Sequence, residues 1–243
     1  AIDDLTAAGP AGPIPLRLYR PTTEAFPPVL VYLHGGGLVM GSNHSFQPPL
    51  ARELAHASGA AVVSVDYRLA PESPPPAQFD DAYAATEWVA AQADTLVLDA
   101  GRLAVVGDSA GGSLAAAVAL AARDHGGPKI TAQVLLYPGL DRDMGTTSIT
   151  SMPDAPMLRH DDILYMHELV DQGGGGGAAG SLPNPGLCKR SARPAARHRG
   201  HRGGVRPDPG LGGRTLRVPT AGCRRADDAH ALPGHVPRLP DAL

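Results

Sequence analysis

Gly107-Asp108-Ser109-Ala110-Gly111-Gly112 stands between two apolar runs of different character. Residues 103–106 are typical of a buried strand, and the alanine-rich residues 113–122 are typical of a helix. The pattern G-x-S-x-G between a strand and a helix predicts a sharp turn that lifts the serine hydroxyl onto the N-terminus of the helix. The flanking glycines give this turn the small neighbours it needs. Ser109 is therefore our candidate nucleophile for attack on a carbonyl carbon.

A glycine-rich turn that only joins a strand to a helix is the simpler alternative, because the chain contains 30 glycine residues. A second motif argues against it. His34-Gly35-Gly36-Gly37 follows the apolar residues 29–33, which predict another buried strand. Three glycines after a strand free several backbone N–H groups to converge on one point, where acyl transfer needs donors for a developing negative charge.

We predict that this oxyanion hole is formed by the N–H groups of Gly35 and Gly36, with the N–H of Ala110 as the third donor. His34 belongs to the same loop and has to reach the Ser109 hydroxyl to serve as a base. We therefore interpret His34 as a brace of the loop and not as the catalytic base.

Four segments together resemble the hormone-sensitive-lipase-like esterases of the α/β-hydrolase fold. They are His34-Gly35-Gly36-Gly37, then Asp66-Tyr67-Arg68-Leu69-Ala70-Pro71-Glu72, then Gly107-Asp108-Ser109-Ala110-Gly111-Gly112, and finally Leu136-Tyr137-Pro138-Gly139. Their order and spacing fit the family across roughly residues 10–170. The resemblance implies an esterase for short acyl or small aromatic esters. It implies a Ser-Asp-His triad that needs neither cofactor nor metal.

The resemblance leaves a second class of function open, because the same family includes receptors that kept the pocket and lost a triad member. A non-catalytic binder of small ligands is therefore the alternative to an esterase. The family also has an N-terminal cap of helices over its active site, which the first residues of this sequence do not supply. We interpret the charged residues in 66–72 as structural, with Arg68 and Glu72 paired or capping.

Alternating strand and helix patterns fill the first two-thirds of the chain and predict the α/β-hydrolase fold, a mostly parallel sheet with helices on both faces. Residues 14–19 predict an edge strand, and Asp80, Asp81 and Glu87 are expected on the solvated face of a helix. The remaining predicted elements are strands at 29–33, 60–65, 103–106 and 130–136, and helices at 48–58, 77–94 and 113–122.

Composition excludes several partners. The net charge of −3 favours neither a nucleic-acid nor a membrane-surface partner, and no apolar run approaches the length of a membrane span. The first residues lack the basic start and apolar core of a signal peptide, so we expect a cytoplasmic protein. Cys188 and Cys223 are the only cysteines, which implies no disulfide framework. A small-molecule ester is the expected ligand, and association as a homodimer stays open.

The pattern changes in the last third. Residues 1–170 fit a hydrolase core, whereas residues 171–243 should complete the same domain and have the wrong composition for it. Isoleucine is absent from residues 171–243, and eleven arginines fall between residues 190 and 238. Such a segment is typical of a basic, low-complexity tail and lacks the β-branched residues of further parallel strands.

A shifted reading frame explains this composition. Taking the last two bases of each codon with the first base of the next, residues 232–240 become compatible with Tyr-Pro-Gly-Met-Phe-His-Gly-Phe. Residues 206–211 likewise permit Asp-Pro-Ile-Arg-Asp, and residues 193–205 permit Gly-Leu-Pro-Pro-Ala-Thr-Val-Val-Thr-Ala-Glu. These segments resemble the family's surroundings of its histidine, its acid and the strand before that acid, in one frame and in family order. We place the slip near the glycine run 173–177.

The shift decides which triad residues can be named. The encoded histidine would straddle Pro237 and Arg238, and the encoded acid would straddle Arg206 and Pro207. In the written sequence Asp208 and His235 lie within a few positions of these codons and are the fallback acid and base.

Overall fold

Residues 1–21, 24–45 and 47–172 are described by the computed structural model, and all of them fall within one unit of the chain, Ala1–Leu187. The strands are β1 (Ile2–Gly9), β2 (Gly12–Tyr19), β3 (Pro28–Leu33), β4 (Ala61–Val65), β5 (Asp99–Asp108) and β6 (Ala132–Leu136). The helices are α1 (Pro48–Ser58), α2 (Ala77–Gln92), α3 (Ala110–His125), α4 (Thr147–Ser151) and α5 (His160–Gln172).

The six strands form one sheet in the order β1-β2-β4-β3-β5-β6. Strands β4, β3, β5 and β6 pair in parallel, and β1 and β2 are antiparallel additions at one side. Each parallel strand reaches the next through a helix, as in β3-α1-β4, β4-α2-β5 and β5-α3-β6. The prediction of a mostly parallel sheet is confirmed.

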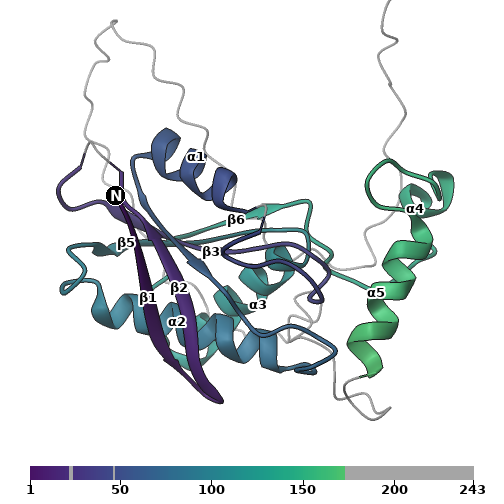
Figure 1. Cartoon of the computed structure of the whole chain (residues 1–243), viewed down its shortest axis with the longest axis horizontal. Coiled ribbons are helices and arrows are strands. Elements are labelled where there is room, and N and C mark those ends of the chain that lie inside the picture. Colours follow the sequence, from purple (N-terminus) through teal and green to yellow (C-terminus); the bar gives the residue numbers. More distant parts are fainter. Residues whose placement is uncertain (22–23, 46, 173–243) are drawn as a thin grey trace, which may run out of the picture. The chain divides into compact units, whose positions relative to one another are not determined.

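Helices cover both faces of this sheet (Figure 1). On one face, α1 packs with Ala51 and Ala55 against Tyr32, Val62 and Val106. On the other face, α2 and α3 cover the alternate residues of the same strands, among them Val31, Val63 and Val105. Because side chains of a strand alternate between faces, near-continuous apolar strands are what a doubly covered sheet requires.

The edge of the sheet differs from the prediction. Residues 14–19 lie in β2, which is an inner strand, because β1 pairs with it along its whole length. The sequence of β1 carries two aspartates and gives no strand signal by itself. Both are neutralised across the strand pair: Arg17 Nε lies 2.6 Å from Asp4 Oδ1, and Arg20 Nε lies 3.0 Å from Asp3 Oδ2.

The expected solvated face of α2 is wrong at Asp81, whose side chain is only 3% exposed. Asp81 accepts hydrogen bonds from Arg68 Nε at 2.8 Å, from Arg68 Nη2 at 2.8 Å and from the Arg68 backbone N–H at 3.1 Å. Arg68 therefore pairs with Asp81 and not with Glu72. The structural interpretation of the segment 66–72 holds for Arg68, but its partner lies on a helix and not in the segment.

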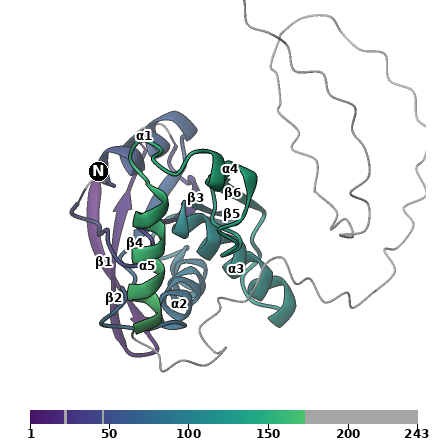
Figure 2. The same ribbon diagram turned by 90° about the vertical axis from the view of Figure 1, so that its right-hand side faces the viewer.

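Two helices that the sequence analysis did not predict follow β6. Figures 1 and 2 place α5 beyond the ends at which β3 and β5 lead into the loops of the predicted site. The helix contacts the rest of the unit through Val170, which joins the main core, and through Met166, which lies against Gly37. Within the described residues, no helix combines the length and apolar character needed to cross a membrane.

We predict that Leu103→Ala, at a fully buried position of β5, lowers the free energy of unfolding by about 2–5 kcal/mol, because it leaves a cavity between β5 and its covering helices. Val134→Ala is the matched control on β6, where the side chain is 45% exposed, and should cost less than about 1 kcal/mol. Urea denaturation of both variants measures the difference. Equal losses would contradict the position of the core.

Candidate active site

Ser109 occupies the turn between β5 and α3. Its backbone angles are φ 53° and ψ −122°, a region that a residue with a side chain rarely adopts. The Ser109 N–H donates to the carbonyl of Leu136 at the end of β6, 2.9 Å away. The serine is half-buried, and its hydroxyl has no hydrogen-bond partner among the described residues. The hydroxyl is therefore free to approach a bound molecule.

The glycines of the turn are required by close backbone contacts. A Cβ on Gly107 would overlap the carbonyl of Gly111. A Cβ on Gly111 would overlap the carbonyl oxygens of Leu33 and His34, at the point where β3 enters the triple-glycine loop. The start of α3 is thus pressed directly against the start of this loop, which brings the two sequence motifs together.

The triple-glycine loop forms a tight turn directly after β3. Gly36 has φ 121°, which a side chain disfavours, and its carbonyl accepts from the N–H groups of Val39 and Met40 at 3.0 Å each. The N–H groups of Gly36, Gly37 and Ala110 have no acceptor among the described residues. Ala110 directly follows Ser109, and the loop that carries Gly36 and Gly37 begins where Leu33 and His34 meet Gly111 of the same turn.

The backbone N–H of Gly35 was expected to be a free oxyanion donor, but it is already hydrogen-bonded within the protein. Its N–H donates to the Asp108 side chain, with 3.0 Å between the nitrogen and Oδ1. The sequence motif alone could not reveal this, because the acceptor comes from the other motif, 73 residues further along the chain. Asp108 Oδ1 also accepts a hydrogen bond from the Tyr32 hydroxyl at 2.7 Å.

His34 lies beneath the loop and is fully buried. Its Nδ1 lies 2.8 Å from the Gly35 carbonyl, and its ring stacks on Tyr67 at a centroid distance of 4.2 Å. The Tyr67 hydroxyl donates to the His34 carbonyl at 2.6 Å. Nδ1 therefore carries the proton that the Gly35 carbonyl accepts, and the buried Nε2 has no hydrogen-bond partner among the described residues. This geometry agrees with a brace.

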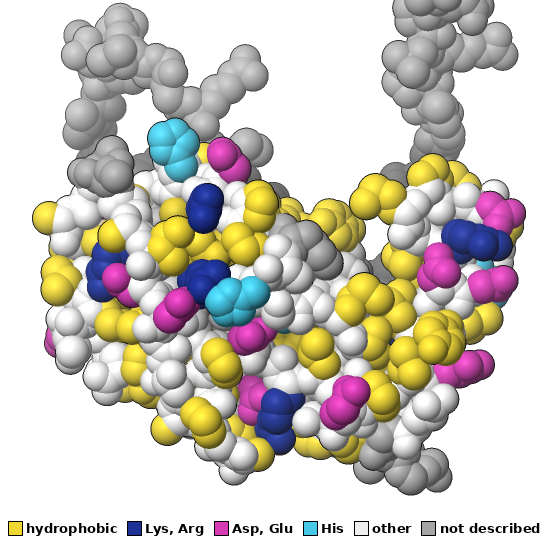
Figure 3. Space-filling view, in the orientation of Figure 1, with side chains coloured by type: hydrophobic (Ala, Val, Ile, Leu, Met, Phe, Trp, Pro, Cys, Tyr) yellow, Lys and Arg dark blue, Asp and Glu magenta, His cyan; other side chains and the backbone are white. Residues whose placement is uncertain are grey.

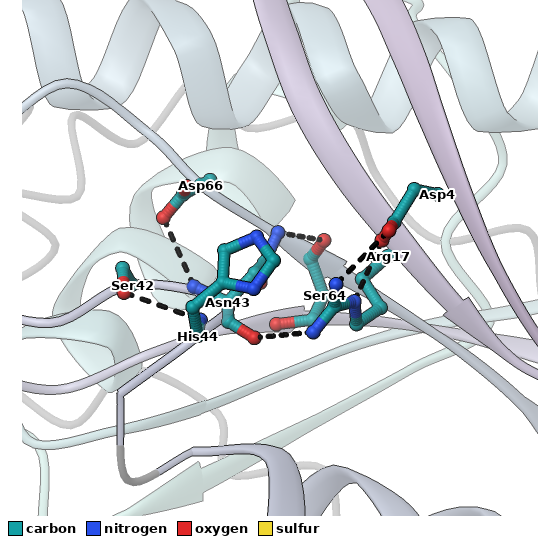
Figure 4. A network of polar contacts seen from close by, with 7 residues as sticks. All are labelled: Asp4, Arg17, Ser42, Asn43, His44, Ser64 and Asp66. Atoms are coloured by element: carbon teal, nitrogen blue, oxygen red, sulfur yellow. Dashed lines mark hydrogen bonds and ion pairs between the residues drawn. The ribbon is translucent and has the colours of Figure 1, made fainter.

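The segment after the loop is anchored by Asn43 (Figure 4). The Asn43 backbone N–H donates to Asp66 Oδ1 at 3.1 Å, and its side-chain Nδ2 donates to the Ser64 carbonyl at 3.2 Å. The Asn43 carbonyl accepts from Arg17 Nη1 at 3.0 Å. Asp66 thus contributes to the loop's position, and Asn43 is a residue that sequence reasoning missed because its partners come from β2, β4 and the turn after β4.

One apolar side chain of α5 contacts the triple-glycine loop. Met166 of α5 lies against Gly37, so that any Cβ there would overlap its Sδ. Figure 3 shows hydrophobic side chains gathered over the part of the surface formed by α4, α5 and the segment between them. The exposed large hydrophobic residues of positions 152–165 are Met152, Met157, Leu158, Leu164 and Tyr165. Met166 thus brings an apolar side chain of α5 to the triple-glycine loop.

The structure describes the candidate nucleophile but not the candidate acid and base. Asp208 and His235 lie outside the described residues, as do the codons at 206–207 and 237–238. Among the described residues, no histidine is hydrogen-bonded to Ser109. In the same part of the chain, no cluster of three or more His, Cys, Asp or Glu side chains is placed to hold a metal ion.

Comparison with known proteins agrees with this fold. Residues 30–185 match the family described as having the alpha/beta hydrolase fold, and the chain belongs to this family. Among curated relatives, an esterase of Mycobacterium tuberculosis, LipI, is 50% identical over 158 residues, which cover 64% of this chain and 49% of the relative. The ethyl acetate hydrolase of Pseudomonas putida is 43% identical over 161 residues, covering 64% and 50%.

Solved structures give the same result. The hyperthermophilic esterase of the archaeon Pyrobaculum calidifontis superimposes with a TM-score of 0.66 at 44% identity, over 70% of this chain and 55% of that one. A carboxylesterase from a metagenomic library, EstE1, does so with a TM-score of 0.66 at 39% identity, over 70% and 58%. The chain spans about half the length of the curated relatives it matches.

We predict a pH dependence of stability from His34. Burial lowers the pKa of His34 below its usual value, since protonation would bury a charge and leave Nε2–H without an acceptor. The unfolded chain then takes up a proton below about pH 6.5 that the folded chain does not. The free energy of unfolding should be highest above that pH and fall by at most about 1.4 kcal/mol per pH unit below it.

Denaturation at pH 7.5 and pH 5.5 measures this loss. His34→Asn keeps a donor for the Gly35 carbonyl and should flatten the dependence, whereas His56→Gln, at an exposed position of α1, should leave it unchanged. An identical loss in wild type and His34→Asn would remove His34 as its source.

Proposed function

We propose that this protein is a serine carboxylesterase that hydrolyses short-chain or small aromatic esters through an acyl-enzyme on Ser109. The observation that carries the proposal is a serine in strained backbone geometry at the start of α3, where this helix packs against the start of the triple-glycine loop. The N–H groups of Gly36 and Ala110 have no acceptor among the described residues. The names of the relatives support it, since LipI is an esterase and the Pseudomonas relative hydrolyses ethyl acetate.

The mechanism follows from these positions. Ser109 Oγ attacks the ester carbonyl carbon, and its proton passes to a base while the carbonyl oxygen becomes an oxyanion. Gly36 and Ala110 N–H groups stabilise that oxyanion, each contributing about 3 kcal/mol to the transition state. Collapse of the intermediate breaks the bond to the alcohol, which leaves with the proton. Water then attacks the acyl-enzyme by the same route and releases the acid.

The apolar surroundings support a small apolar substrate. Met166 narrows the space above Gly37, and Met40 at the end of the loop is half exposed. An ester with a short acyl chain or a small ring needs no charged partner in such a site, and its one polar group is the carbonyl that the backbone donors receive.

We further propose that residues 171–243 complete the domain in a shifted reading frame, which supplies the acid and the base. Three observations support this. The family match stops at residue 185 although the chain runs to residue 243. Side chains of β6 at Ala132, Gln133 and Val134 are exposed, although a parallel strand is normally covered on both faces. The shifted frame restores three family-like segments in order.

We predict that a fluorophosphonate probe labels Ser109 covalently, because the probe's phosphorus is attacked as an ester carbonyl carbon is. Ser109→Ala should abolish labelling, and Ser58→Ala on the exposed side of α1 should not. Mass spectrometry of the labelled peptide checks the position. Labelling that persists in Ser109→Ala would exclude this serine as the nucleophile.

A non-catalytic binder stays the second candidate, because no base is hydrogen-bonded to Ser109 among the described residues. Neither labelling nor hydrolysis of p-nitrophenyl acetate is expected of it. Hydrolysis that depends on Ser109 would exclude it.

The frame proposal has its own test. We predict that inserting or deleting one base within the codons for residues 173–177 raises kcat/KM for p-nitrophenyl butyrate by about a thousandfold or more, because a triad without its base loses most of its rate. The control is the gene as written, with resequencing of these codons. Efficient hydrolysis by the written chain that is lost in His235→Ala would contradict the shift and make His235 the base.

A further inference from the structure

One carboxylate oxygen joins the two motifs of the site. Asp108 Oδ1 accepts from the Tyr32 hydroxyl at 2.7 Å and from the Gly35 N–H at 3.0 Å. Asp108 is covalently attached to Ser109, and Gly35 opens the triple-glycine loop. The nucleophile and the loop are therefore tied together by a side chain as well as by backbone packing.

The contact is close as well as directional. A Cβ on Gly35 would overlap Asp108 Oδ2 and approach the Asp108 carbonyl to 3.1 Å. The carboxylate therefore contacts the backbone of Gly35, and a movement of the loop away from Asp108 would break the bond to Oδ1. Gly36 is the next residue, so this anchor restrains its position, and its own N–H has no acceptor among the described residues.

The second donor keeps the carboxylate in place. Tyr32 is fully buried at the end of β3, and burial together with Asp108 raises the pKa of its hydroxyl well above the usual value. Tyr32 therefore stays protonated at any pH at which an esterase is assayed. It donates to Asp108 from below while Gly35 donates from the loop.

We propose that Asp108 is a positioning residue that sets the distance between Ser109 and the Gly36 N–H, and that Gly35 is its anchor and not an oxyanion donor. The inference rests on the proposed function of Ser109. It goes beyond that function because it removes one donor from the expected oxyanion hole and assigns a role in the reaction to a side chain that touches no substrate.

Three variants separate the acceptor from the charge and the bulk of Asp108. Asp108→Asn keeps an acceptor oxygen and removes the charge. Asp108→Leu keeps the volume and removes the acceptor, and Asp108→Ala removes both. Asp141→Ala, at an exposed carboxylate after β6, is the control. The measurements are the rate constant of fluorophosphonate labelling of Ser109, the amide hydrogen-exchange rate of Gly35, and the melting temperature.

Asp108→Leu and Asp108→Ala should label about a hundredfold more slowly, since a misplaced donor costs about as much as a missing one. In both variants the Gly35 amide should exchange at least about tenfold faster, because its acceptor is gone. Asp108→Asn should stay within about tenfold of the wild-type labelling rate. Where Asp108→Ala does not fold, Asp108→Leu and Asp108→Asn carry the comparison.

Unchanged labelling in Asp108→Leu or Asp108→Ala would overturn the inference, and so would faster labelling, which would mean that Asp108 withholds Gly35 from the oxyanion. Labelling of Asp108→Asn as slow as that of Asp108→Leu would assign the effect to the charge and overturn the positioning role. A protein that stays unlabelled even after the reading frame is restored contradicts the proposed function itself, and Gly35 exchange then tests the hydrogen bond alone.

Discussion

The close backbone approach between the start of α3 and the end of β3 is the constraint on which the site depends. Gly111 meets the carbonyls of Leu33 and His34 without room for a Cβ, and Ser109 accepts strained angles at the same turn. Strain of this kind persists only where the surrounding structure determines the backbone. The backbone at Ser109 is fixed because β5 lies between two parallel strands, and because the Ser109 N–H donates to the carbonyl of Leu136 at the end of β6.

The triple-glycine loop has little intrinsic order and takes its shape from its neighbours. The buried ring of His34 and the Tyr67 hydroxyl support it from below, and Asp108 holds its first amide. Asn43 fastens the chain beyond it to Asp66 and Ser64. Fixed dipoles are effective in catalysis because they need no reorganisation when charge develops. These contacts fix the backbone of this short loop, which is what preorganised backbone dipoles require.

Polar groups near the site mostly serve this positioning. Arg68 and Asp81 tie the segment after β4 to α2, and Tyr32 and Asp108 tie β3 to the elbow. Charged residues close to a reaction centre invite a catalytic interpretation from sequence. Their partners in the structure are other protein groups. The donors of the site that have no acceptor among the described residues are backbone amides, which a sequence motif can indicate only indirectly.

Sequence by itself determined the strand–turn–helix around Ser109, the loop after β3 and the mostly parallel sheet, because apolar periodicity and obligatory glycines are local signals. It identified α1 with its observed bounds and most of β2, β3 and β4. It could not find β1, whose aspartates become compatible with a strand only beside Arg17 and Arg20. Only the tertiary structure decided that Asp81 is buried against Arg68 and that the Gly35 N–H belongs to Asp108, since each bond joins residues distant in the chain whose approach is set by packing of the whole sheet.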